Sequence, residues 1–385
     1  MNRHAPLAAE RALRAAPPHA LPAALTEVLR THCAARSVEI LLADYGLAVL
    51  QPVSAPEPAE AAVPVAGTPE GRCFGAQEPF AEPAGEDGVR LHLPVSVRGD
   101  RIGVLSVGLP GEPAPEEVRD LAEIAEVLGH HLLVADRDTD RYLRARRRER
   151  LTLAAEVQWE LLPGRACARP EYALGAQLEP AYDIHGDNFD WSASARDLTL
   201  TVTNGMGEGI EAALLTSLTV NALRNARRAG VPLADQAALA DQAVYARYRG
   251  ERYVSVLLMR FDLATGAAEV VEAGSPRVYR LRGSAVETIG FEAQFPLGMF
   301  EDTPYVPQPF EVRSGDRLLV VSDGVYATAS PGGETYGERA LARAALATRL
   351  LPAADVPGAI LGELPGHRVL PEAEDDALIV CLDWR

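Results

Sequence analysis

The sequence contains no lysine, so all 37 of its basic residues are arginine, which we attribute to the base composition of the genome. No apolar run is long enough to span a membrane, and the N-terminal segment contains no signal-peptide core. The formal net charge of −17 argues against a nucleic-acid partner, because such partners bind cationic surfaces. We therefore expect a cytoplasmic protein with neither a membrane nor a nucleic-acid partner.

Cysteine is scarce as well. Cys33, Cys73, Cys167 and Cys381 are far apart in sequence and lack the pair spacing that is typical of metal sites. Scattered thiols in a chain of 385 residues indicate a reducing compartment. Only Cys73, in a polar segment, is a candidate for a redox function, and a free thiol is the simpler interpretation.

The length suits two domains, and 48% apolar with 24% charged residues is a globular composition. Residues 1–20 are rich in Ala, Arg and Pro and are predicted to form a disordered tail. The segments that follow predict, in order, a helix from Pro22, strands at 38–42 and 47–50, a long loop at 54–88, a hairpin at 89–107 and a helix from Pro115.

This order of elements resembles a GAF domain, a small α/β sensor fold of bacterial signalling proteins. Residues 94–105 are similar to the core strands of that family, and the resemblance covers residues 21–135. It implies an N-terminal α/β sensor domain. GAF domains often bind small molecules, and a purely structural or dimerising role is the alternative.

Residues 136–163 are expected to form a helical linker. The segment holds six arginines and few apolar residues: Arg141, Arg144, Arg146, Arg147, Arg148 and Arg150. Such a run is typical of a solvated helix face. The alternative is a signalling helix that pairs with a second copy of itself, because neither Gly nor Pro interrupts the chain from Leu132 to Leu162. On this basis we expect a homodimer.

The C-terminal part contains four clusters of acidic or amide residues at the ends of strand-like segments. They lie at 186–190, 204–209, 322–325 and 374–376. Carboxylates gathered from separate strand ends suit hard cations such as Mg²⁺ or Mn²⁺. Each cluster alone is more typical of a turn than of a metal ligand, so only their joint order indicates a site.

The ordered motifs resemble the SpoIIE/RsbU branch of the protein phosphatase 2C superfamily. The similar segments are an entry helix at 155–163, the first acidic motif at 180–190, a metal loop and helix at 205–213, an Ala-Gly-Ser-Pro turn at 273–276, short motifs at 296–298 and 314–316, and the acidic motifs at 322–325 and 375–376. The resemblance covers residues 164–385 and part of the helix before them. It implies an α-β-β-α sandwich with two mainly antiparallel sheets.

The resemblance also implies metal-dependent hydrolysis of phosphoserine or phosphothreonine, with two divalent cations, Mn²⁺ or Mg²⁺, activating a water molecule. No side chain is then expected to act as the nucleophile. Position by position, the metal site would consist of Asp187, Asn204, the carbonyl of Gly205, Asp323 and Asp375. Asp190 and Asp376 would support it by orienting ligands or capping turns.

This chain departs from the family pattern at several positions. Asn204 stands where the family has an aspartate that bridges both metals, and a neutral amide offers one weaker oxygen and no charge. His185, Ser275 and Ala327 also differ from the pattern. Two hypotheses follow: an active phosphatase that acts on a phosphorylated signalling protein, such as an anti-sigma-factor antagonist, or a pseudophosphatase that binds such a protein without turnover. The simpler interpretation of Asn204 is that it caps a turn while other ligands hold the metals.

Overall fold

The computed structural model describes residues 5–54, 61–85, 88–180, 182–183, 185–368 and 375–385. The chain divides into two compact units, Met1–Arg150 and Leu151–Arg385, which we describe separately. Within the described residues, no helix has the length and apolar character needed to cross a membrane.

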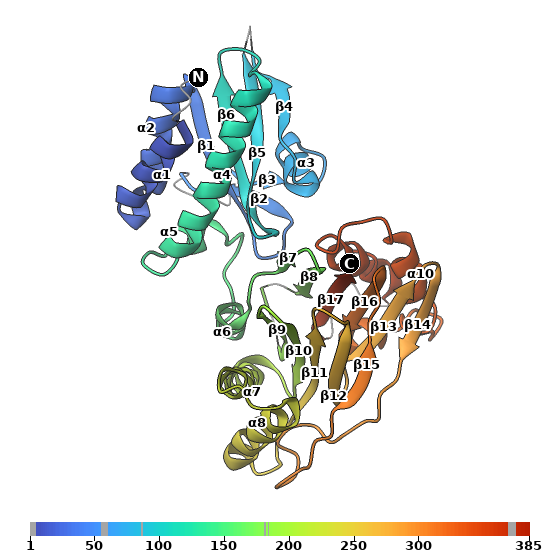
Figure 1. The fold of residues 1–385 in the computed structure, drawn as a ribbon. Helices are drawn as coiled ribbons and strands as arrows, with labels where there is room; N and C mark the ends of the chain where they lie inside the picture. The colour runs from blue at the N-terminus through green and yellow to red at the C-terminus, as the bar shows by residue number, and fades with distance from the viewer. Residues whose placement is uncertain (1–4, 55–60, 86–87, 181, 184, 369–374) are drawn as a thin grey trace. The chain divides into compact units, whose positions relative to one another are not determined.

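The N-terminal unit is built on one six-stranded sheet in the order β3-β2-β1-β6-β5-β4 (Figure 1). Its strands are β1 (Ser37–Ala43), β2 (Val49–Pro52), β3 (Val63–Pro64), β4 (Phe80–Pro83), β5 (Val89–Val97) and β6 (Asp100–Leu109). The predicted hairpin is confirmed by the antiparallel pairing of β5 with β6. Its turn places Arg98 and Gly99 at positive φ, as the twist of a tight hairpin requires.

Helices cover both faces of this sheet. One face packs against α1 (Ala5–Ala15), α2 (Leu21–Cys33), α4 (Pro115–Ala135) and α5 (Arg141–Ala145), with a short 3₁₀ turn at Pro18–Ala20. The opposite face packs against α3 (Pro69–Ala76), whose Cys73 and Phe74 join a smaller apolar cluster. Successive side chains of β5 point to alternate faces, so Leu91 and Leu93 face α4 whereas His92 faces the α3 side.

Two of the predictions for these segments were wrong. Residues 5–15 of the expected disordered tail form α1, because Ala5, Ala9 and Leu13 recur at helical spacing and are buried. The expected loop at 54–88 contains β3, α3 and β4. Its high content of Pro and Gly is typical of a loop, yet α3 begins there, with Pro69 in its first turn and the hydroxyl of Thr68 as its N-cap.

The expected continuous helix over 132–162 is interrupted. After α4 the chain forms only α5 and then α6 (Leu153–Leu161), and Thr152 caps the start of α6. The arginine-rich segment between them lacks an apolar stripe to hold a helix against a core. The homodimer remains a prediction, without the support of that helix.

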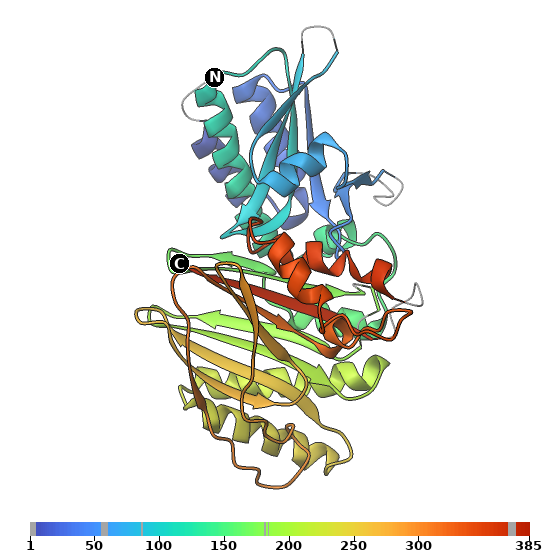
Figure 2. The same cartoon turned by 90° about the vertical axis from the view of Figure 1, so that its right-hand side faces the viewer.

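The C-terminal unit is a sandwich of two sheets with helices outside each, arranged in four layers (Figure 2). The five-stranded sheet, in the order β15-β12-β11-β10-β9, consists of β9 (Asp187–Ala193), β10 (Asp197–Gly205), β11 (Val254–Asp262), β12 (Ala267–Ala273) and β15 (Gln308–Glu311). Outside it lie α7 (Gly209–Arg228) and α8 (Leu233–Tyr248). This sheet pairs in antiparallel fashion throughout its described strands.

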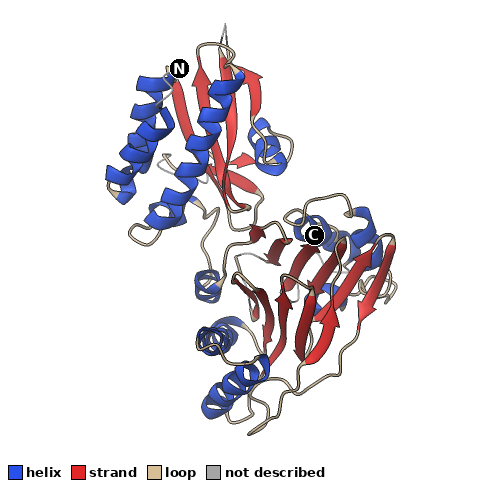
Figure 3. Cartoon of the chain, viewed as in Figure 1, coloured by secondary structure: helices blue, strands red, loops and turns tan. Residues whose placement is uncertain are grey.

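The second sheet has six strands in the order β14-β13-β16-β17-β8-β7 (Figure 3). They are β7 (Ala166–Ala168), β8 (Tyr172–Glu179), β13 (Arg277–Arg282), β14 (Ala285–Ile289), β16 (Asp316–Val321) and β17 (Ala377–Trp384). Short helices cover it: α9 (Asp323–Tyr326), α10 (Ala340–Ala347), α11 (Val356–Leu361) and α12 (Leu364–His367). Every residue of β16 is buried, as expected for a central strand covered on both faces. The predicted sandwich of antiparallel sheets is confirmed.

Candidate metal centre

Antiparallel pairing brings the predicted acidic positions to one edge of the sandwich. On the first sheet, the start of β9 lies beside the end of β10, so that Asn204 is directly opposite Asp187. On the second sheet, β16 ends where β17 begins, with Val321 opposite Ile379. Asp323 therefore follows one strand at the same edge at which Asp375 and Asp376 precede the other. Ala181 and Glu374, which belong to the predicted motifs, lie outside the described residues.

Asp376 joins the two sheets at this edge. Its carboxylate accepts hydrogen bonds from the backbone N–H groups of His185 (2.7 Å), Gly186 (2.8 Å) and Asp187 (3.1 Å). One carboxylate from the second sheet thus fixes the segment that enters the first. Asp376 is therefore occupied in orienting the backbone on either side of Asp187.

Three other carboxylates lie near this junction and interact through their charges, although their oxygen atoms do not all lie within 4.8 Å of one another. Burial, followed by the nearby charge of Asp376 and then those of Asp323 and Asp375, raises the pKa of Asp187 well above its usual value, although the Ser322 hydroxyl opposes this. Burial and the charge of Asp323 likewise raise the pKa of Asp375. For Asp376, burial raises the pKa to about 6 in spite of its backbone hydrogen bonds. Like charges in a desolvated cluster favour the neutral acids unless a cation is bound.

These residues fit divalent cations. Both oxygens of Asp187 are buried and form no hydrogen bond of good geometry with any described group. Unpaired buried carboxylate oxygens are costly, and they are the ligands that Mg²⁺ and Mn²⁺ prefer. The mutual repulsion of Asp187, Asp323 and Asp375 would be relieved by the same ions.

The side chain of Asn204 is directed into this cluster. Its Nδ2 amide donates a hydrogen bond of 2.6 Å to Oδ1 of Asp323. The orientation is chemically reasonable, because the carboxylate is only an acceptor and requires a donor opposite it. Asn204 is therefore a partner of a predicted metal ligand and does more than cap a turn.

Asp190 has a different environment. Its carboxylate forms ion pairs of 2.8 Å with both Arg224 and Arg227, which fasten α7 to β9. Arg224 also bonds the carbonyl of Leu161 at the end of α6. Asp190 therefore supports the site through the packing of helices and neither orients a metal ligand nor caps a turn.

Several residues that hold the site were not predicted from the sequence. Gln158 of α6 is buried and accepts a hydrogen bond from Asn188 of β9 (3.0 Å). Thr216 of α7 donates to the carbonyl of Gly186 (2.8 Å). A polar residue on the apolar face of a predicted helix is the signal that would have identified both.

Arg252 was missed as well. Its guanidinium lies against Gly207, so that a Cβ added to that glycine would be 3.2 Å from Nη1. A cation beside the loop that follows Asn204 and Gly205 suits an anionic substrate such as a phosphate ester. The loop that precedes β11 gave no sequence signal for this role.

Gly186 allows the strand ends to approach each other, and its replacement by alanine is expected to destabilise the protein. The added Cβ would lie 2.2 Å from the carbonyl oxygen of Gly205. Overpacking of this kind costs about 1–3 kcal/mol. Urea unfolding should show that loss for Gly186→Ala and none for Gly290→Ala, where no described atom lies within 4 Å. Equal free energies of unfolding for the two variants would contradict the close packing described here.

Comparisons with known proteins identify relatives of this chain. Residues 194–385 match the family model of stage II sporulation protein E (SpoIIE). Phosphoserine phosphatase RsbU of Bacillus subtilis (strain 168) is 21% identical over 214 residues, or 55% of this chain and 64% of that protein. The chain thus spans less than two thirds of the length of this relative.

Two solved structures share the fold. One contains the PP2C phosphatase domain and a fragment of the regulatory domain of SpoIIE from Bacillus subtilis, with 14% identity, a TM-score of 0.50, and coverage of 80% of this chain and 82% of that one. The other is the SiaA-PP2C domain of Pseudomonas aeruginosa, with 19% identity, a TM-score of 0.51, and coverage of 60% and 94%. Residues 194–385 of this chain therefore match the SpoIIE family, and the C-terminal unit has the fold of protein phosphatase 2C domains.

Proposed function

We propose that the C-terminal unit is a metal-dependent protein serine/threonine phosphatase. The observation that carries the proposal is the convergence of Asp187, Asp323 and Asp375 at one edge of the sandwich, where the oxygens of Asp187 are buried and unpaired among the described residues. We propose these three carboxylates and the carbonyl of Gly205 as metal ligands. Two bound cations, Mn²⁺ or Mg²⁺, would supply a water molecule of lowered pKa as the nucleophile.

Each neighbouring residue has a part in this proposal. Asp376 holds the backbone of 185–187 and so fixes the position of Asp187. Arg252 would receive the phosphate dianion beside the loop at Gly207. No covalent enzyme intermediate is required.

A protein substrate is favoured by apolar side chains beside the site. Met206, Ile210 and Leu214 are 44%, 36% and 48% exposed, although each is large and hydrophobic. The spacing of four residues places Ile210 and Leu214 on one face of α7, next to the loop that carries Gly205. A phosphoserine protein of bacterial signalling, such as an anti-sigma-factor antagonist, would have both the phosphate and the apolar contact surface.

The N-terminal unit is proposed as the regulatory input. Its order of helix, strands, hairpin and helix follows the pattern from which the GAF-like assignment was predicted. The assignment rests on that pattern alone. A small-molecule ligand of this unit belongs to the same proposal.

Mn²⁺-dependent hydrolysis of a phosphoserine protein tests the proposed activity. We expect turnover with Mn²⁺, none with a chelator, and a loss of at least about 100-fold for Asp375→Asn, because a ligand that stabilises the transition state is removed. Asp262→Asn is the matched control, since that aspartate only caps an exposed turn at the end of β11. Equal activity of the two variants would refute the assignment of the site.

One observation favours a second candidate, a pseudophosphatase that binds phosphoproteins without turnover. Asn204 neutralises the position opposite Asp187 and occupies an oxygen of Asp323 with its amide. Tight binding of the phosphorylated partner, with no release of phosphate at any Mn²⁺ concentration, would establish this alternative.

A further inference from the structure

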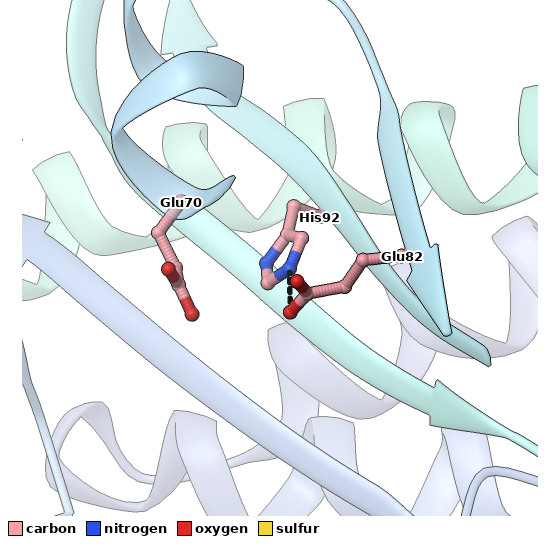
Figure 4. Close-up of side chains that lie close together, drawn as sticks. All are labelled: Glu70, Glu82 and His92. Carbon is pink, nitrogen blue, oxygen red and sulfur yellow. Dashed lines mark hydrogen bonds and ion pairs between the residues drawn. The ribbon is translucent and has the colours of Figure 1, made fainter. Parts of the chain in front are cut away.

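A second group of potential metal ligands lies in the N-terminal unit, on the sheet face that α3 covers. Glu70, Glu82 and His92 each offer a ligand atom, and these atoms all lie within 4.8 Å of one another. Figure 4 shows the three side chains extending into the same space from α3, β4 and β5. Among the described residues of the whole chain, this is the only group of three or more such side chains within that distance.

Strand register determines two of the three positions. His92 lies on β5 between Phe80 of β4 and Ser106 of β6. Glu82 is two residues beyond Phe80, and side chains two apart share a face of the sheet. The carboxylate of Glu82 therefore reaches Nε2 of His92, with Oε1 at 3.2 Å.

That distance also suits two ligands of one ion. Zinc–nitrogen and zinc–oxygen bonds of about 2.1 Å place neighbouring ligand atoms about 3.0–3.4 Å apart in octahedral or tetrahedral geometry. Ser106 Oγ lies 2.8 Å from Nδ1 of His92. If Nδ1 donates to that hydroxyl, the lone pair of Nε2 can bind an ion. Metal-binding histidines usually donate their other ring N–H to an oxygen acceptor in this way.

A hydrogen-bonded pair of His92 and Glu82 does not account for the position of Glu70. It is only 8% exposed, and its carboxylate forms no hydrogen bond or ion pair with any described residue. Arg72, which could have neutralised it, instead stacks over the ring of Phe80 at 4.5 Å. A bound cation would offset the cost of burying this carboxylate beside a second carboxylate and an imidazole.

The backbone around α3 is built to bring Glu70 to this place. Thr68 accepts a hydrogen bond from the N–H of Gly71 and so begins the helix. A Cβ at Gly71 would lie 1.7 Å from the carbonyl oxygen of Val65, so only glycine allows α3 to approach this closely. The side chain of Glu82 is 32% exposed, which leaves a path from solvent to the site.

We propose that Glu70, Glu82 and His92 form a binding site for a divalent first-row transition-metal ion, with Zn²⁺ as the ion to test. One imidazole and two carboxylates suit such ions, and three protein ligands leave at least one coordination position open. This site is separate from the carboxylate cluster of the C-terminal unit. It gives the proposed regulatory unit a chemically defined input: the metal itself, or a small molecule that fills the open position.

Equilibrium dialysis of the full chain against Zn²⁺, with bound metal measured by elemental analysis, tests the proposal. Two of the proposed metal ligands of the C-terminal cluster are first removed with Asp323→Asn and Asp375→Asn. In that background we expect one bound equivalent, which Glu70→Gln and Glu82→Gln each weaken at least about tenfold, because even outer partners of metal ligands contribute about 10- to 100-fold. Both substitutions preserve side-chain shape.

The matched control is Glu10→Gln. Glu10 accepts from His131 Nε2 at 3.1 Å, a pair like that of Glu82 and His92, but its other partner is Arg14 and no third ligand is present among the described residues. This variant should bind Zn²⁺ like its parent. If the background protein does not fold, Glu70→Gln, Glu82→Gln and Glu10→Gln are made in the otherwise unaltered chain. There, only Glu70→Gln and Glu82→Gln should lose one equivalent of bound Zn²⁺. Absence of a bound equivalent, or equal binding by all three variants, would overturn the proposal.

Discussion

Replacing Asp187 with asparagine is expected to stabilise the metal-free protein as the pH rises towards neutrality and to abolish its stabilisation by Mn²⁺. Burial and the charges of Asp376, Asp323 and Asp375 raise the pKa of Asp187 in the folded state. A raised pKa means that the folded state binds the proton more tightly than the unfolded state. The stability that protonated Asp187 contributes is therefore fully present below the unfolded pKa of about 3.9 and is lost as the pH rises through the folded pKa.

Asparagine resembles the protonated acid and carries no charge to bury. The variant should therefore not lose stability in this way as the pH rises. Thermal melting in the presence of a chelator, from pH 5 to about 8, should show a smaller fall in melting temperature for the variant than for wild type. With Mn²⁺ bound, wild type should become more stable than the variant. At a metal concentration of about 100 times Kd, wild type should gain about 2.7 kcal/mol and the variant should gain nothing.

Asp316 provides a control of opposite sign. It is equally buried, but Arg282 binds both of its oxygens, at 2.6 and 2.7 Å. Burial acts against the ionised form, yet the hydrogen bonds from Arg282 hold the pKa of Asp316 below its usual value. Asp316→Asn should therefore destabilise the protein at neutral pH, with or without Mn²⁺. If Asp187→Asn also destabilised the metal-free protein at pH 7, the carboxylate repulsion described here would be wrong.

Asn204→Asp is expected to strengthen Mn²⁺ binding at least about tenfold, or about 1.4 kcal/mol, and to raise or create phosphatase activity. The new carboxylate would stand between Asp187 and Asp323, where the amide now donates to Asp323. Without metal it would add another repelling charge to the cluster, so the metal-free variant should melt at a lower temperature than wild type. With metal, the same charge would offset the repulsion between two cations.

Asn204→Ala should be inactive and should serve as the neutral control. Asn204 precedes Gly205, and Asn-Gly sequences deamidate readily because glycine leaves the next backbone nitrogen free to attack the amide. Peptide mass spectrometry should therefore accompany each assay, so that activity from a deamidated fraction is recognised. If the Asn204→Asp variant binds Mn²⁺ no better than fresh wild type, the missing charge does not limit the site, and the changes at His185 and Ser275 become the better explanation.

The fold of the C-terminal unit was predicted from the resemblance of its ordered motifs to a known family, and the positions of those motifs at strand ends are local signals. Asp323 and Asp375 stand at the ends of apolar strands, and antiparallel pairing then brings such ends together. The separate roles of the acidic residues were not predictable from the sequence. Asp375 and Asp376 are neighbours in sequence, yet only the folded structure shows that Asp376 binds three backbone amides while Asp375 faces Asp323.

The N-terminal unit shows the reverse case. The segment of α3 and β4 has the composition of a loop, and what orders it is tertiary: the approach of Gly71 to Val65 and the pairing of Phe80 with His92. Glu70, Glu82 and His92 are 22 residues apart at most and follow no metal-ligand spacing, so the group was invisible before the strands were placed. In the same way, α1 is short and rich in alanine, and it is recognisable only once a sheet is present for it to cover.

The three hydrogen bonds that Asp376 accepts make the proposed metal centre and the contact between the two sheets a single cooperative unit. The amides of 185–187 belong to one sheet and the carboxylate to the other, so separating the sheets must disperse the ligands at the same moment. Ligand occupancy and sandwich integrity are therefore thermodynamically linked. A phosphoprotein that binds at this edge would hold the two halves of the sandwich together, and a protein that loosened the sandwich from its far side would release both metal and substrate.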